Sequence, residues 1–282
     1  GKLSSQTNRL HNAPRTDVSW YQAVAFTRWL TAQLRGDVSS GGTRVNGSTW
    51  EVRLPTEWEW QWAAQGGSEQ RAYPWGSWQA GHANATRVLT STTAVGMYPR
   101  GAAVSGVLDM SGNVWEWCLN KWDSPHSTTV DTTNAYRVLR GGSFNLGRGL
   151  ASSSVRDSRY PYLAGILNGF RVGLFPPGSS SLSVDGNPRV GNSEDGAKLR
   201  SVALGKAERL LRELDRSTVT DARRRAIGVQ LDKIGDPRPG VGVENGVPDI
   251  DWVYVSPGGS VDIEGTRKGV SPFYLSKYPV TY

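Results

Sequence analysis

The sequence predicts a compact α+β domain that contains little regular secondary structure. The 282 residues include 34 glycines and 12 tryptophans, and all but one of the tryptophans precede residue 123. Large aromatic side chains beneath glycine-rich loops can hold such a fold together, because each ring buries a large area. Helix and strand patterns are too short and too few for a helical bundle or a doubly wound sheet. A loop-rich α+β domain is the class that remains.

The composition excludes several other classes of protein. Hydrophobic residues make up 37% and charged residues 20%, as in globular rather than disordered proteins. No apolar run reaches about 18 residues and the N-terminus lacks an apolar signal core, so we expect no membrane span and no export signal, with the cytoplasm as default location. The net charge of +7 is scattered along the chain, which indicates a solvated surface rather than a specific nucleic-acid partner. Arginine outnumbers lysine, a bias consistent with heat tolerance or with genome composition.

Two helices are predicted in the first quarter of the chain. Residues 18–35 are amphipathic, with Ser19 as a candidate N-cap. Residues 55–65 carry a capping box in Thr56 and Glu59. Three alternate tryptophans of the second helix cannot share one face, so we expect at least one of them at the surface. They are Trp58, Trp60 and Trp62.

Strand-like segments follow at 114–118, 136–140 and 169–174. In the first of them, Trp115 and Trp117 flank Glu116, and the period of two predicts that the carboxylate faces away from both rings.

The composition changes after Pro177, which suggests four segments. We expect the main part of the domain over 1–177, a flexible linker over 178–196, a helical appendage over 197–240 and further strands over 250–282. The elements predicted in the last two segments are helices at 197–214 and 218–234 and strands at 251–256 and 272–280.

An ordered series of motifs now becomes visible along the first 175 residues. The motifs are RLPTEWEWQWAA (53–64), YPWG (73–76), GHANA (81–85), VGMYP (95–99), LDMSGNVWEWC (108–118), RVLRGGSF (137–144) and GFRVG (169–173). In order and spacing, this series resembles the formylglycine-generating, sulfatase-modifying domain. The resemblance implies an α+β fold of the C-type lectin-like class.

A second match lies at the far end of the chain. DWVYVSPGG (251–259) and SPFYLSKYPVT (271–281) resemble the opening of the same domain, which in the family precedes the 18–35 helix. Either the chain is circularly permuted, with 178–196 joining the former ends, or its numbering runs around a missing segment. In both cases we expect 250–282 to complete the domain begun by 15–175.

The family's oxidase activity depends on a pair of cysteines that bind copper in the loop after RGGS. Here that loop, 144–156, has no cysteine, and Leu146 and Ala151 occupy the approximate positions of the pair. Thiolates are the ligands that select Cu(I), so aliphatic side chains cannot replace them. The chain's one cysteine, Cys118, belongs to a strand pattern and is expected to be a buried apolar residue. We expect no copper.

A second enzyme branch with this fold needs three clustered histidines to hold iron. The three histidines of this chain are far apart and show no metal-binding spacing: His11, His82 and His126. With neither metal set present, the sequence predicts that the protein is not an enzyme.

A binding protein is the function that the sequence then favours. The RGGS motif, Arg156 and the GFRV motif frame a segment whose hydrophobic residues follow neither a helical nor a strand period. Its mixture of aromatic, small polar and aliphatic side chains resembles that of an antibody paratope. The frame is similar to the variable region of proteins diversified by retroelements, and we expect a protein or other macromolecule as ligand, bound on a shallow patch. The predicted contact residues are Phe144, Asn145, Leu146, Gly147, Gly149, Leu150, Asp157, Ser158, Tyr160, Tyr162, Leu163, Ile166 and Leu167. The alternatives are an inert loop, a formylglycine-generating-type oxidase, or a degenerate regulatory or structural family member.

The motif LDMSGNVWEW also resembles a structural calcium site of the family. The matching positions supply two carboxylates and two backbone carbonyls, the mixed oxygen ligands that suit Ca²⁺. These predicted metal ligands are Asp109, Gly112, Val114 and Glu116.

Overall fold

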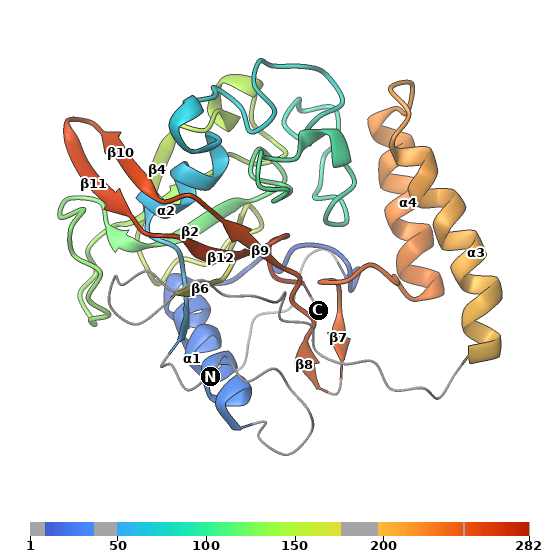
Figure 1. Cartoon of the computed structure of the whole chain (residues 1–282), viewed down its shortest axis with the longest axis horizontal. Coiled ribbons are helices and arrows are strands. Elements are labelled where there is room, and N and C mark those ends of the chain that lie inside the picture. The colour runs from blue at the N-terminus through green and yellow to red at the C-terminus, as the bar shows by residue number, and fades with distance from the viewer. Residues whose placement is uncertain (1–8, 37–49, 176–196, 245, 282) are drawn as a thin grey trace.

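The computed structural model describes residues 9–36, 50–175, 197–244 and 246–281. The expected linker, 178–196, lies outside these residues. Two four-stranded sheets form the centre of the molecule (Figure 1). Helix α1 (Trp20–Gly36) packs on one side of them, and helix α2 (Glu57–Ala64) packs on the other. Within the described part of the chain, no helix is both long enough and apolar enough to cross a membrane.

The first sheet joins the two ends of the sequence. Its strand order is β1 (Glu51–Arg53), β6 (Gly173–Phe175), β12 (Phe273–Ser276) and β9 (Trp252–Val255), with antiparallel pairing throughout. Tyr274 of β12 lies opposite Leu174 of β6 on one side and Tyr254 on the other. The C-terminal strands therefore occupy the middle and one edge of a sheet whose other strands come from the first 175 residues.

The second sheet carries the predicted GNVWEW and RGGS motifs. Its order is β4 (Arg156–Arg159), β3 (Arg137–Arg140), β2 (Trp115–Lys121) and β5 (Asn168–Gly169). Strands β4, β3 and β2 are antiparallel neighbours, and the short β5 runs parallel to β2. Trp115 and Trp117 lie in the core beneath α1, whereas Glu116 contacts Trp60 of α2, as the alternation predicts.

The helix starts follow their sequence signals. Ser19 and Gln22 form a reciprocal cap at α1, with the Gln22 amide 3.3 Å from Ser19 Oγ and the Ser19 amide 2.8 Å from Gln22 Oε1. Thr56 and Glu59 form the predicted capping box at α2. These short-range bonds define where each helix begins, within two residues of the expected bounds.

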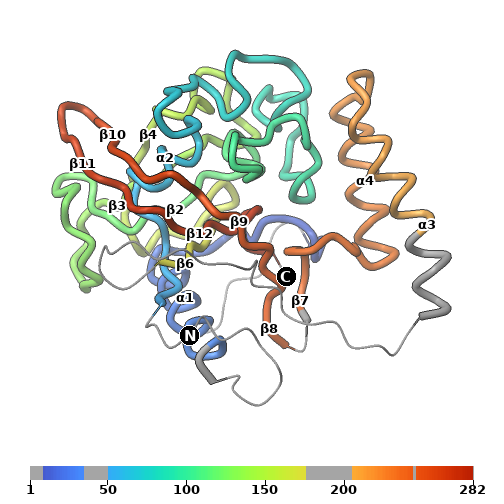
Figure 2. Tube along the Cα trace, in the orientation of Figure 1, coloured from blue at the N-terminus to red at the C-terminus, as the bar shows by residue number. Residues whose placement is uncertain are grey.

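The expectation of a surface tryptophan on α2 is wrong, because all three rings are buried. A hairpin of β10 (Gly259–Ile263) and β11 (Thr266–Val270), which the sequence does not predict, packs across the helix (Figure 2). Trp62 Nε1 donates to the Pro257 carbonyl at 3.0 Å, and Trp58 Nε1 donates to the Thr266 carbonyl at 3.3 Å. Trp60 instead faces β2, where its Nε1 donates to Glu116 Oε2 at 2.7 Å. The hairpin thus covers a helix face that would otherwise meet water.

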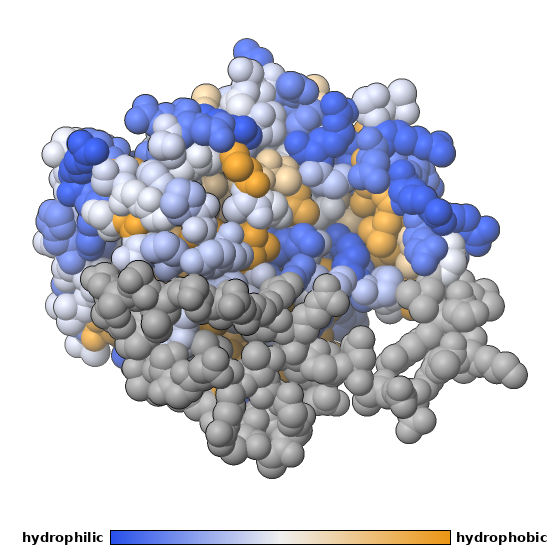
Figure 3. Space-filling view, in the orientation of Figure 1, coloured by the Kyte–Doolittle hydropathy of each residue, from blue (hydrophilic) through white to orange (hydrophobic). Residues whose placement is uncertain are grey.

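Helices α3 (Ala197–Leu214) and α4 (Asp221–Ile234) form a pair at one side of the domain. Their buried side chains pack on Ala94, Met97 and Tyr98, and Arg224 donates to the Met97 carbonyl at 2.7 Å. Hydrophilic residues dominate their outer surface in the view of Figure 3. A short hairpin of β7 (Val243–Glu244) and β8 (Val247–Pro248) leads back to the first sheet.

Candidate ligand-binding surface

The segment from Phe144 to Leu167 runs over the edge of the second sheet. It leaves β3, forms a short 3₁₀ helix at Arg148–Ala151, supplies the edge strand β4 and ends before β5. The predicted contact residues with exposed side chains or backbone are Asn145, Gly149, Leu150, Tyr160, Tyr162, Leu163 and Ile166. Those that are half-buried are Leu146, Gly147, Asp157, Ser158 and Leu167. Most of the segment is therefore accessible to solvent, whereas the neighbouring strands β3 and β2 of the same sheet are buried.

Three tyrosines form a stacked row at this surface. Tyr160 lies 4.2 Å from the ring of Tyr136 and 5.4 Å from the ring of Tyr162, with interplanar angles of 27° and 16°. The rings stay accessible, with Tyr162 at 52% and the other two at 36% exposure. Tyr136 lies outside the segment predicted from sequence, and only the pairing of β3 with β4 brings it there. The row presents one continuous aromatic surface.

Phe144 is a correction to the predicted contact set. Its side chain is 5% exposed, so it offers no contact area to a ligand. The Phe144 amide donates to the Asn113 carbonyl at 3.1 Å, which turns the chain inward directly after the RGGS motif. Leu146 and Leu167 are half-buried and pack against the main core, and each presents only part of its side chain.

Buried arginines hold this segment in place. Arg140 is fully buried and donates to the carbonyls of Ser154 and Val155 at 2.9 Å each, to that of Ser153 at 3.3 Å, and to Gln61. Arg156 binds Glu57 through Nε and Nη2, at 2.9 and 2.8 Å. Guanidinium groups can satisfy several carbonyls at once, which suits them to fixing a loop that has no backbone ladder of its own.

A second buried arginine network connects the two sheets. Arg171 binds Glu116 with Nε–Oε2 and Nη2–Oε1 distances of 2.5 and 2.7 Å, and Trp60 Nε1 donates to the same carboxylate at 2.7 Å. Arg171 also donates to the Leu108 and Ser276 carbonyls. The network therefore ties β2 to β12 and to the calcium-like motif.

A cavity of about 300 Å³ opens within the candidate surface. Its apolar walls are Trp115, Leu146, Leu150, Val155 and Leu167, and its charged residues are Arg156, Asp157 and Arg159. The sequence predicts a shallow patch, and the structure adds this hollow to it. One wall, Trp115, comes from strand β2, so the pattern of residues 144–167 alone does not predict the hollow.

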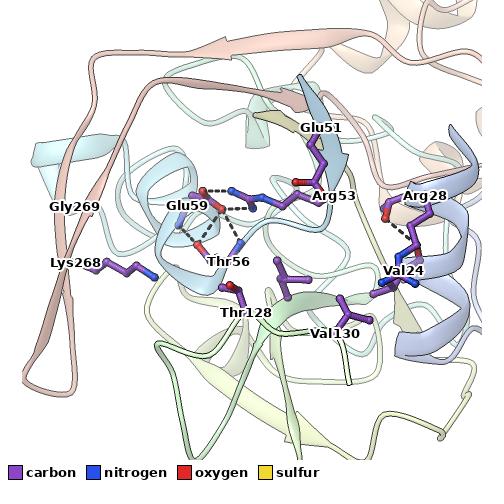
Figure 4. Close-up of a pocket in the computed structure, with 12 residues that line it drawn as sticks. Val24, Arg28, Glu51, Arg53, Thr56, Glu59, Thr128, Val130, Lys268 and Gly269 are labelled. Carbon is purple, nitrogen blue, oxygen red and sulfur yellow. Dashed lines mark hydrogen bonds and ion pairs between the residues drawn. The ribbon is translucent and has the colours of Figure 1, made fainter. Parts of the chain in front are cut away.

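A second cleft, of about 410 Å³, lies between α1, β1, α2 and β11. Two of its five charged residues pair with each other: Arg53 binds Glu59 at 2.7 and 2.8 Å, and Glu59 accepts from the Thr56 amide at 2.7 Å (Figure 4). This arrangement stabilises the start of α2. We regard the 144–167 surface as the candidate site because it carries the row of accessible tyrosines.

The predicted calcium ligands are only partly free to bind an ion. Both oxygens of Glu116 accept bonds from Arg171, whose charge neutralises them. Asp109 accepts from the Gly96 amide at 2.6 Å, and burial raises the pKa of its carboxyl to about 6. Among the described residues, no group of three or more histidine, cysteine or acidic side chains is arranged to hold a metal. Both oxygens of Glu116 are therefore engaged in the buried ion pair with Arg171, while the calcium site itself stays a prediction.

Replacing Asp109 with asparagine is expected to stabilise the protein above pH 6. The folded-state pKa of about 6 exceeds the ordinary 3.8, so the folded protein retains this proton more readily and loses stability as the pH rises through 6. Asparagine removes the buried charge and can still accept from Gly96. The variant should gain on the order of 2 kcal/mol in unfolding free energy at pH 8 and little at pH 4, measured by urea denaturation at both values.

Calcium binding at Asp109 is still a prediction, and the Asp109→Asn variant can test it. An ion bound to Asp109 would hold the carboxylate charged, and EDTA would then lower the melting temperature of the wild type but not that of Asp109→Asn. A gain from Asp109→Asn that is equal at pH 4 and pH 8 would contradict the burial argument.

The residues present do not match the family's metal sites. Cys118 is fully buried, and burial raises the pKa of its thiol well above the ordinary value, which disfavours the thiolate that copper requires. The histidines lie in three different settings: His11 is exposed, His82 is buried beside Trp75, and His126 stacks on Trp58. Neither the two-thiolate nor the three-histidine set is assembled within the described residues.

Comparison with known proteins places this chain in a family. Residues 1–173 match the family model of the sulfatase-modifying factor enzyme 1-like domain. The chain is 34% identical over 171 residues to the formylglycine-generating enzyme of Thermomonospora curvata, covering 51% of this chain and 48% of that enzyme. It is 32% identical over 178 residues to the hercynine oxygenase of Mycolicibacterium smegmatis, covering 56% of this chain and 37% of that enzyme. The chain thus spans about half the length, or less, of these curated relatives.

Among solved structures, a variable protein from Treponema denticola is similar, with a TM-score of 0.47 and 23% identity over 62% of this chain and 76% of that one. The α+β class expected from the sequence is confirmed by the helices and antiparallel sheets of the structure, and the formylglycine-generating type of this fold is confirmed by the family match over residues 1–173.

These relatives correct one prediction. The sequence led us to expect a protein that is not an enzyme, yet formylglycine-generating enzymes and hercynine oxygenases are enzymes, and their similarity points to an enzyme family. The inference from missing cysteines and histidines concerned two particular metal sites and does not extend to the family. Since the matched model covers more than half of the chain, the protein belongs to the sulfatase-modifying factor enzyme 1-like domain family.

Proposed function

We propose that this protein binds a macromolecular ligand through the surface formed by residues 144–167 together with Tyr136. The observation that carries the proposal is the row of three stacked, accessible tyrosines on a firmly held frame. Tyrosine contributes a large contact area at low cost in side-chain entropy, and it is enriched where proteins bind each other. Leu163 and Ile166, at 41% and 47% exposure, add apolar area beside the row.

The rigidity of the support favours the same conclusion. The loop backbone is held by Arg140, by Arg87, whose Nε donates to the Asn145 carbonyl at 3.1 Å, and by Ser111, whose hydroxyl donates to the Ala151 carbonyl at 2.7 Å. A surface that is ordered before binding loses less entropy on association. An exposed apolar cluster is also uncommon on a protein surface that binds nothing.

A paired substitution tests the proposal. Tyr160→Ala with Tyr162→Ala should leave the melting temperature within about 1–2 °C, because exposed side chains contribute little to folding. The same variant should bind ligand at least about tenfold more weakly, since central tyrosines dominate interface energies. Ligands are first selected with the wild-type protein from a displayed library of protein fragments, and their dissociation constants are then measured for both proteins.

Tyr254→Ala is the matched control, because Tyr254 is also an exposed tyrosine, at 42%, but lies on β9 of the other sheet. Selected fragments that bind wild type and the double variant equally would refute the proposed surface. A large fall in melting temperature would show instead that the tyrosines belong to the scaffold.

The resemblance to retroelement-diversified proteins extends the proposal to sequence variation. We propose that sister copies of this protein differ at the exposed positions of 144–167 while retaining Arg140, Arg156 and Arg171. Sequencing such copies tests this, and copies identical over 144–167 but divergent elsewhere would contradict it.

A further inference from the structure

We infer that the cavity lined by Arg159 and by leucines of the 144–167 segment binds a carboxylate group of the ligand together with a neighbouring apolar side chain, and that Arg159 is the anchor. The inference rests on the proposed function, because it assigns a chemistry to one part of that surface. Two arginines, Arg156 and Arg159, line the cavity. Of these two, Arg159 is the one that no described residue neutralises.

The other lining arginine is already satisfied. Arg156 makes a two-pronged bond with Glu57 and a further ion pair with Glu264. Arg159 is half-buried, yet within the described part of the chain its Nε has no hydrogen-bond partner and its guanidinium forms no ion pair. A partly desolvated guanidinium without partners is costly, and a bound carboxylate would supply two parallel acceptors.

The sheet register increases the need for an anion. Arg159 lies directly opposite Arg137 in the β3–β4 pair. Arg137 is held by the Leu119 carbonyl and by Asp131, each at 3.1 Å, so its own charge is compensated. Like charges opposite each other on neighbouring strands repel. An anion at Arg159 would relieve this repulsion.

The remaining walls define what accompanies the carboxylate. Leu146, Leu150 and Leu167 with the ring of Trp115 provide an apolar lining, and about 300 Å³ accommodates one medium-sized side chain. Asp157 lines the same cavity and repels an anion near it, which restricts the carboxylate to the Arg159 side. A C-terminal apolar residue, or an acidic side chain next to an apolar one, carries this combination of groups.

Three peptides distinguish these sources. The first is Gly-Ser-Gly-Ser-Leu with a free C-terminus, the second is its C-terminal amide, and the third is an acetylated and amidated Gly-Ser-Glu-Leu-Ser. Each is titrated into the ¹⁵N-labelled full chain while the backbone and arginine Nε–H signals are followed by NMR. We expect the first or the third peptide to bind at least about tenfold more tightly than the amide, and to shift the Arg159 Nε–H signal.

The variant Arg159→Met should abolish this preference without lowering the melting temperature, because it removes an uncompensated charge. Arg148→Met is the control, since Arg148 is an exposed arginine of the same segment that does not line the cavity. Equal binding of the amide and both carboxylate peptides, or no binding of any at millimolar concentration, would overturn the inference. A further outcome separates the two proposals. If library-selected fragments require Tyr160 and Tyr162 but bind Arg159→Met as tightly as the wild type, the carboxylate inference is wrong and the proposed function still stands.

Discussion

Replacing Glu116 with glutamine is expected to lower the melting temperature by roughly 10 °C. The substitution leaves the guanidinium of Arg171 fully buried without its counter-charge. Breaking one side of a buried ion pair costs about 3–5 kcal/mol, because the remaining charge is neither solvated nor paired. For a chain of this size each kcal/mol corresponds to about 2–4 °C. Differential scanning calorimetry at pH 7 measures the effect.

Two further variants separate the buried charge from general damage. Glu213→Gln breaks the Arg223–Glu213 pair on the helical appendage, where both side chains reach solvent, and should change the melting temperature by no more than about 2 °C. Glu116→Leu combined with Arg171→Met removes both charges and should cost less than Glu116→Gln alone. A loss below about 1 kcal/mol for Glu116→Gln would show that Arg171 finds other compensation.

Replacing Arg140 with methionine is expected to loosen the candidate surface as well as the fold. Arg140 is fully buried, and burial lowers the pKa of its guanidinium to about 10. Removing the guanidinium leaves one buried acceptor, the Ser153 carbonyl, and two part-buried acceptors, the Ser154 and Val155 carbonyls, without this donor. Unsatisfied acceptors cost about 1–3 kcal/mol each, so we expect a fall in melting temperature on the order of 10 °C.

Hydrogen exchange shows where that loss occurs. Amide protection should fall most over residues 144–156, and ligands selected on the wild type should bind more weakly. Arg148→Met again serves as the control, because it makes the same chemical change at an exposed position of the segment. If amide protection falls uniformly across the domain, Arg140 stabilises the whole fold and has no particular role in ordering the 144–167 surface.

The local parts of this structure could be predicted from the sequence. The capping box of Thr56 and Glu59 and the alternation around Glu116 depend on residues within three positions of one another, so the pattern itself contains the information. The exposure of Tyr162 also follows from the absence of any hydrophobic period in its segment.

The features that sequence could not predict depend on neighbours from distant parts of the chain. Trp58 and Trp62 are buried because a hairpin from the last thirty residues covers α2. Tyr136 joins the tyrosine row through strand pairing, and the cavity at Arg159 takes one wall, Trp115, from the distant strand β2. The prediction that the protein is not an enzyme was wrong for a different reason. The missing cysteines and histidines exclude two particular metal sites, but they do not decide whether the chain belongs to a family of enzymes.

The hairpin over α2 has a consequence for synthesis on the ribosome. Trp62 and its acceptor at Pro257 are 195 residues apart. At translation rates of about 5–20 residues per second, α2 waits roughly 10–40 s for its cover. During that interval a helix with three tryptophans has one side open to water, in a chain whose first sheet still lacks β9 and β12. Such a nascent chain is a natural client for chaperones that recognise aromatic surface, and its native core closes only when the C-terminal strands arrive.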